Sequence, residues 1–86
     1  AEALGRLGKA DDRVIKALLE ALGDSDIFVR QSAAEALGQL GKVEDRVIEA
    51  LLKALGDSDY GVRREATEAL GKLGKADDRV IVALLQ

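Results

Sequence analysis

A repeat of 33 residues is the feature that most limits how this chain can fold. Placing residues 1–33 over 34–66 gives 24 identities in 33 positions by direct count, and placing 34–53 over 67–86 gives 14 in 20. Eight of the nine glycines obey this period, and only Gly61 does not. Repeats of this length are supersecondary units that bury their apolar faces by stacking on one another. We therefore expect one repeat domain over 1–86, with copies at 1–33 and 34–66 and a partial copy at 67–86.

The first helical pattern in each period runs from Asp12 to Leu22. Its apolar side chains recur at helical spacing and form one face, which comprises Val14, Ile15, Leu18, Leu19 and Leu22. Such a pattern is typical of an amphipathic helix. Asp11 and Asp12 can accept hydrogen bonds from its first amide groups, and Gly23 suits its C-terminal cap. We refer to a helix at this position of the repeat as an A helix.

The second pattern, which we name the B helix, runs from Ile27 to Leu40 and stops at Gly41. Its apolar face comprises Val29, Ala33, Ala36, Leu37 and Leu40. Either Ser25 or Asp26 can serve as its N-cap, so the Gly-Asp-Ser-Asp segment predicts a tight turn between antiparallel helices. The first copy begins in the middle of a B helix, and the expected order is a partial B helix, A, B, A, B and a final A helix.

A glycine inside the B helix predicts close packing between helices. Gly38 should cost about 1 kcal/mol relative to alanine at a helix interior. It recurs as Gly5 and Gly71, which indicates that a neighbouring helix approaches where the side chain is missing. Helix pairs stacked in this way predict an all-α fold, a right-handed α-solenoid of antiparallel helix pairs.

The pattern Gly-Asp-Ser-Asp-x-x-Val-Arg-x-x-Ala-x-Glu-Ala-Leu-Gly-x-Leu-Gly occurs at 23–41 and again at 56–74. It resembles the HEAT-like repeats of the phycobilisome-lyase type and the consensus-designed artificial proteins built from that repeat, and the resemblance covers the whole chain. It implies that the B helices line a concave surface. It also implies a ladder between repeats, made by loop aspartates and B-helix arginines: Asp24, Arg30, Asp57 and Arg63.

Composition argues against an enzyme and against several classes of partner. The chain has neither histidine nor cysteine, so it offers no imidazole base for a nucleophile and no soft metal ligand, and we expect no catalytic residues, no metal and no cofactor. Its paired carboxylates precede helices, where capping explains them. The net charge of -3 opposes nucleic-acid binding. Charges interrupt every apolar run, which argues against a membrane span or signal peptide. The sequence predicts a soluble chain, cytoplasmic or in a compartment that the residues do not specify.

Differences between copies gather on the side of the B helices that faces away from their apolar residues. This stripe predicts the partner-binding surface and comprises Ile27, Phe28, Gln31, Ser32, Glu35 and Gln39 in one copy and Tyr60, Gly61, Arg64, Glu65, Glu68 and Lys72 in the next. The only aromatic residues, Phe28 and Tyr60, lie in it, and aromatic residues and arginine are enriched in binding hot spots. The alternatives are a solvent face that varies freely, and packing of Ile27 and Phe28 between repeats.

Two functions follow from these patterns. The first is a non-catalytic scaffold for protein-protein interaction through the concave B-helix surface, with the partner unidentified. The second is a structural repeat unit, natural or designed, that associates head to tail through apolar ends without capping repeats. The residues expected in that contact are Leu4, Leu7, Ile81, Leu84 and Leu85. A longer parent array with flanking repeats accounts for the same ends equally well.

Overall fold

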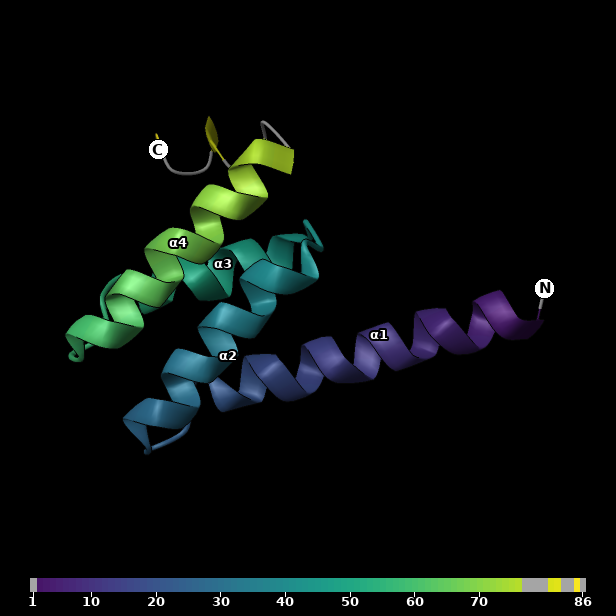
Figure 1. Ribbon diagram of the computed structural model, residues 1–86, viewed down its shortest axis with the longest axis horizontal. Coiled ribbons are helices and arrows are strands. Elements are labelled where there is room, and N and C mark those ends of the chain that lie inside the picture. The colour runs from purple at the N-terminus through teal and green to yellow at the C-terminus, as the bar shows by residue number, and fades with distance from the viewer. Residues whose placement is uncertain (1, 77–80, 83–84, 86) are drawn as a thin grey trace.

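The computed structural model describes residues 2–76, 81, 82 and 85, with side chains for 12–75, 81, 82 and 85. Four helices make up this part of the chain: α1 (Glu2–Ala21), α2 (Ile27–Leu40), α3 (Asp45–Ala54) and α4 (Tyr60–Ala76). Helices α2 and α4 lie side by side, α3 lies behind them, and the N-terminal half of α1 extends past the other helices (Figure 1). The architecture is the expected all-α one, made of helix pairs as in an α-solenoid.

Local capping signals set the bounds of α2, which agree with the predicted B helix. The Asp26 carboxylate accepts a hydrogen bond of 2.8 Å from the Phe28 amide, and the extended backbone of Asp26 begins the helix. Gly41 ends it in the left-handed conformation, with φ at 67°. A residue with a β-carbon is strained there, which explains why glycine occupies the position.

The predicted break before the first A helix is wrong. Asp11 and Asp12 were expected to cap a new helix after Gly8, but α1 is continuous from Glu2 to Ala21. The second copy does break, because α2 ends at Leu40 and α3 starts at Asp45. The same Gly-Lys dipeptide therefore ends a helix in one copy and continues it in another.

The residue after this dipeptide gives a physical reason for the difference. Val43 in the second copy is β-branched, which lowers its helix propensity, and it packs, half-buried, against the core. Both properties favour ending the helix before this residue. The other copies have Ala10 and Ala76 there, and alanine has the highest helix propensity. Helix α4 accordingly continues through Gly74 to Ala76.

Helices α2 and α4 form one layer, and α1 and α3 form the other. The core lies between these two layers and contains many small residues. Its largest fully buried side chains are Ile15, Leu37, Val47, Leu51, Val62, Leu70 and Leu73. A β-carbon added to Gly38 would lie 2.8 Å from the Cα of Ala69, so α2 and α4 approach closely there, as the sequence predicted. At Gly71 the equivalent β-carbon meets nothing within 4 Å. Across the helical segments described, none is both long and apolar enough to cross a membrane.

Candidate functional site

The turns between helices hold a ladder of polar contacts that joins one copy to the next. Arg30 donates from Nε to Asp57 Oδ2 at 3.0 Å and from Nη2 to Asp57 Oδ1 at 3.2 Å. Its Nη1 donates to the main-chain oxygens of Asp24 and Ser25 at 2.8 and 3.2 Å. Two groups lower the pKa of Asp57 by stabilising its carboxylate. The main-chain amide of Asp59 has the larger effect, and the Arg30 guanidinium has the smaller one. The expected ladder thus pairs a B-helix arginine with the loop aspartate of the next copy.

A second polar contact on the same seam involves two residues of the predicted partner-binding stripe. Gln31 donates from Nε2 to Asp59 Oδ2 at 2.8 Å. This amide, together with the Val62 amide at 3.0 Å, lowers the pKa of Asp59. A β-carbon on Gly61 would collide with the Gln31 side-chain amide, so a larger residue there would displace Gln31 from its contact with Asp59. Gln31 and Gly61 therefore contact each other between repeats.

The A helices carry a corresponding link on the other layer. Arg46 donates from Nη2 to Asp12 Oδ1 at 2.6 Å and from Nε to Glu44 Oε1 at 3.0 Å. The guanidinium holds the pKa of Asp12 below its usual value. Because these side chains are about one-third to one-half exposed, this link contributes less than the Arg30–Asp57 contact.

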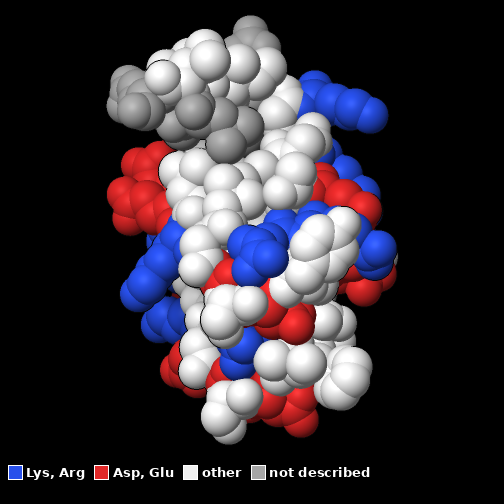
Figure 2. Space-filling model, turned by 90° about the vertical axis from the view of Figure 1, so that its left-hand side faces the viewer, with Lys and Arg blue, Asp and Glu red and all other residues white. Residues whose placement is uncertain are grey.

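The two aromatic side chains lie on the surface, in the first turns of neighbouring helices. Phe28 on α2 and Tyr60 on α4 are each 69% exposed, and Ile27 is also exposed. The guanidinium carbon of Arg63 lies 5.9 Å from the centroid of the Tyr60 ring, within cation-π range. The side of the molecule where α2 and α4 begin shows uncharged surface with acidic and basic side chains interleaved around it (Figure 2). Aromatic groups and charges of both signs therefore occur together on one face.

The other residues of the stripe are mostly solvent-exposed. The exposed members are Ser32, Glu35, Gln39, Arg64, Glu68 and Lys72. Gln39 donates to Glu35 at 3.3 Å along α2. The half-buried Glu65 pairs with Arg64 at 3.5 Å on α4. The structure thus brings Gln31 and Gly61 into the seam and leaves the longer polar side chains in solvent.

The residues predicted for head-to-tail contact are described only in part. Ile81 and Leu85 are exposed. The side chains of Leu4 and Leu7, and the whole of Leu84, lie outside the described residues.

An apolar face that sequence reasoning missed lies on α1 and α2. Val29 and Leu40 of α2 are 37% and 40% exposed, whereas their equivalents one period later, Val62 and Leu73 of α4, are fully buried. An open cavity of about 460 Å³ occupies this face, lined by Leu18, Ala21, Phe28, Val29, Ser32, Ala33 and Ala36. Comparing equivalent positions in the two copies could have found this face, because the apolar pattern is the same and only the neighbouring helix differs.

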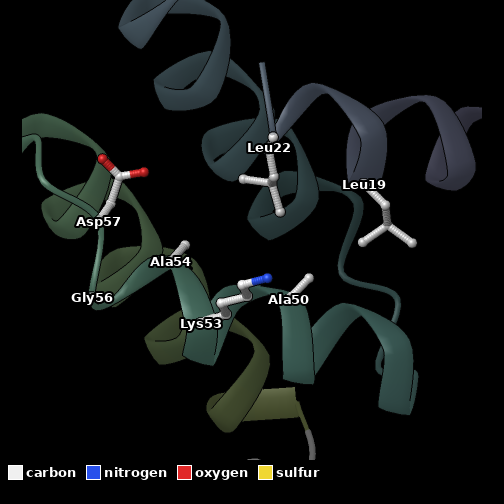
Figure 3. A pocket seen from close by; sticks show the side chains of 8 residues that line it. Leu19, Leu22, Ala50, Lys53, Ala54, Gly56 and Asp57 are labelled. Carbon is white, nitrogen blue, oxygen red and sulfur yellow. The ribbon is translucent and has the colours of Figure 1, made fainter. Parts of the chain in front are cut away.

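A second cavity, of about 470 Å³, lies between the end of α1 and α3 (Figure 3). Leu19 and Leu22 lie across it from Ala50, Ala54 and the aliphatic chain of Lys53. Gly23, Gly56 and Asp57 complete the lining. The Asp57 carboxylate already holds Arg30, so it is not a free acid or base for chemistry in this cavity. In the part of the chain that the structure describes, no group of three or more acidic, histidine or cysteine side chains is placed to hold a metal.

Comparison with known proteins agrees with this architecture. The family model for HEAT repeats matches residues 1–46 and 40–86, and the two matches together span the whole chain. No curated protein matched the sequence. The match explains three features together: the paired helices, the Gly-Asp-Ser-Asp turn in each complete copy, and the arginine–aspartate link between copies. The chain belongs to the HEAT-repeat family.

Proposed function

We propose that this protein is a non-catalytic scaffold that binds another protein through the exposed face of α2 and α4. One observation carries the proposal: Tyr60 and Phe28, the only aromatic residues of the chain, are both 69% exposed on adjacent helices. Aromatic side chains supply large contact areas at low entropic cost, and they are enriched among residues that dominate binding energy. HEAT repeats serve generally as protein-interaction scaffolds, which supports the same function.

Tyr60 is the stronger of the two anchors. Its ring is close to the Arg63 guanidinium, which restricts the ring before a partner arrives, and such restriction reduces the entropy lost on binding. Arg64, Glu68 and Lys72 on α4, together with Glu35 on α2, would form a polar rim of both signs. This arrangement fits a protein segment that inserts an apolar residue and is surrounded by charges of both signs.

Selection of binding peptides from a displayed library against the intact chain tests the proposal. Selected peptides should bind Tyr60→Ala at least tenfold more weakly, which corresponds to about 1.4 kcal/mol. Lys16→Ala, on the exposed side of α1, is the control and should leave the affinity unchanged, and circular dichroism should show full helicity for both variants. Peptides that bind the wild type and Tyr60→Ala equally, but lose affinity for Lys16→Ala, would place the binding surface on the other layer and overturn the proposal.

A self-associating structural unit is a second candidate function. It is favoured by the apolar face of α1 and α2, whose equivalent residues in the second copy are buried by the preceding helices. The face resembles one half of an interface between repeats, so a second molecule that supplies the other half would cover it.

A further inference from the structure

We propose that α2 of one molecule docks on α4 of a second copy, using contacts equivalent to those that join α2 to α4 within the chain. The proposal rests on the second candidate function and specifies its interface. We call the surface formed by Asp24, Asp26, Phe28, Val29, Ala36 and Leu40 the front face of α2. We call the surface formed by Arg63, Arg64, Thr67 and Gly71 the rear face of α4.

The internal interface provides the template for the docking. Within the chain, the side of α2 that carries Arg30 and Gly38 packs on the side of α4 that carries Val62 and Leu73. The residues 33 positions after those of the α2 side lie on the rear face of α4. The residues 33 positions before those of the α4 side lie on the front face of α2. The rear face of α4 can therefore pack on the front face of α2 in the same way. Both belong to this chain, so a second copy supplies the complementary surface.

Gly38 lies at the centre of the internal interface between α2 and α4, and the surroundings of its equivalent, Gly71, are open. Gly38 allows Ala69 to approach so closely that an added β-carbon would lie 2.8 Å from the Ala69 Cα and Cβ atoms. Its equivalent on the rear face, Gly71, has open space at the same position. The equivalent of Ala69 on the front face is Ala36, which lines the open cavity of α1 and α2. Ala36 of one molecule therefore fits against Gly71 of another.

The charged groups of the two faces are complementary. Arg63 donates from Nη1 to the main-chain oxygen of Asp57 at 2.6 Å, in the same way that Arg30 contacts the main-chain oxygen of Asp24. Arg30 then uses Nε and Nη2 for the Asp57 carboxylate. Within the described residues, Arg63 has no such carboxylate and Asp24 has no such guanidinium. Docking pairs Arg63 of one molecule with Asp24 of the other.

The positions that break the repeat also form a matching pair. Inside the chain, Gln31 contacts Asp59 and occupies the space left by Gly61. In the docked pair Arg64 takes the place of Gln31 and meets Asp26 in place of Asp59. Phe28 fills the space that Gly61 leaves open inside the chain, so the Arg64 side chain extends beside the Phe28 ring instead of lying against the backbone as Gln31 does at Gly61. An arginine beside a carboxylate and a phenylalanine ring gains a charge-assisted hydrogen bond and a cation-π contact.

The contact uses different surfaces on the two molecules, so each molecule keeps one free front face and one free rear face. A heterologous contact of this kind extends into rows unless the rotation closes a ring. Association should therefore continue beyond a dimer. Tyr60 is the equivalent of Ile27 rather than of Phe28, and it remains available on the proposed partner-binding surface.

Sedimentation equilibrium of the full chain, from micromolar to millimolar concentration, tests the contact. The mass should rise above the 9.1 kDa of the monomer and pass the dimer value. Gly71→Leu fills the space intended for Ala36 and should weaken association at least tenfold. Lys72→Leu is the matched control, because it adds a leucine at the neighbouring exposed position and should leave association unchanged.

Charge reversal supplies an independent test of the register. Arg63→Asp and Asp24→Arg should each reduce association, because each variant alone opposes like charges. A mixture of the two variants should recover association, because both contacts between unlike molecules again pair opposite charges. Circular dichroism and melting temperature verify folding of each variant. If one of them fails to fold, Gly71→Leu against Lys72→Leu still decides the outcome.

The possible failures are distinguishable. A constant mass of 9.1 kDa at all concentrations would overturn self-association altogether, and with it this contact. Growth that is insensitive to Gly71→Leu and to charge reversal, but is abolished by Leu85→Glu, would overturn this contact and locate association at the chain end. A mass that stops at the dimer would contradict the open, heterologous geometry. None of these results bears on peptide binding at Tyr60.

Discussion

The Arg30 guanidinium and the Asp57 carboxylate make a two-point contact that joins one repeat to the next, with N–O distances of 3.0 and 3.2 Å. Both side chains are only 14% exposed. The planar fork of arginine matches the two oxygens of a carboxylate, which makes such pairs stronger than single-point contacts. The contact therefore links copy to copy as well as capping the turn.

Replacing Arg30 with lysine should lower the free energy of unfolding by about 1 to 3 kcal/mol, because an ammonium cannot satisfy both carboxylate oxygens and the turn carbonyls together. Urea denaturation measures the change. Lys16→Ala is the control, since its 3.8 Å pair with Asp12 is exposed to solvent and should contribute little to stability. Equal effects of the two substitutions would show that the buried fork has no special role.

The two glycines of the B helices should respond to alanine in opposite directions. Gly38→Ala places a methyl group against Ala69 and should destabilise the fold by about 1 to 3 kcal/mol, as overpacking does. Gly71→Ala meets open space and should stabilise α4 by up to about 1 kcal/mol through helix propensity. Melting temperatures at micromolar concentration give both signs. Stabilisation by Gly38→Ala would contradict the close approach of α2 and α4.

Leu51 is completely buried at the centre of the core, and Leu18 is its half-buried equivalent in the preceding copy. Leu51→Ala should cost about 2 to 5 kcal/mol, because it removes buried methyl groups and leaves a cavity. Leu18→Ala should cost clearly less, since solvent already reaches that site. Denaturant midpoints compare the two variants directly, and similar losses would argue against the observed difference in burial.

Stability should fall in acid because the pKa values of Asp57, Asp59 and Asp12 are lower in the folded state. A carboxyl group whose pKa is depressed by folding stabilises the fold fully above its unfolded pKa of about 3.9. That contribution is lost as the pH falls from about 4 through the lower folded values. Melting temperatures measured down this range should decline, and Asp57→Asn should make the decline shallower. An unchanged slope in Asp57→Asn would assign the acid sensitivity to other groups.

Tyr60→Ala should leave the fold almost intact. The ring is 69% exposed, so its removal deletes little buried area, and the lost contact with Arg63 contributes at most about 1 kcal/mol at an exposed site. The melting temperature should therefore shift only slightly. A variant that unfolds would show that Tyr60 has a structural role and would remove it from the binding surface.

The repeat sequence by itself determined that the chain is helical and where α2 begins and ends. Asp26 caps its start and Gly41 its end through hydrogen bonds and a left-handed φ that involve only neighbouring residues. Local signals of this kind are readable because they act within one turn of helix. The apolar period likewise indicated the packing face of each helix, and hence the all-α architecture. Three residues of the predicted faces, Val14, Val29 and Leu40, are nevertheless exposed.

Only part of the candidate site could be predicted from the sequence. The variation between copies predicted the stripe on α2 and α4 and the exposed position of Tyr60. It left open whether Phe28 packs between repeats, and the structure shows that Phe28 is 69% exposed. The engagement of Gln31 with Asp59 and the space that Gly61 leaves for it were not predictable, because a side-chain contact across 28 residues depends on how two helices approach.

Tertiary structure alone decided how equivalent residues in the repeats differ. Gly38 lies under a neighbouring helix and Gly71 does not, although both occupy the same position of the period. Val62 is covered by α2, whereas its equivalent Val29 remains partly in solvent. Identical local sequences carry identical local preferences, but burial depends on whether the adjacent position in the stack is occupied, and that is a property of the assembled helices.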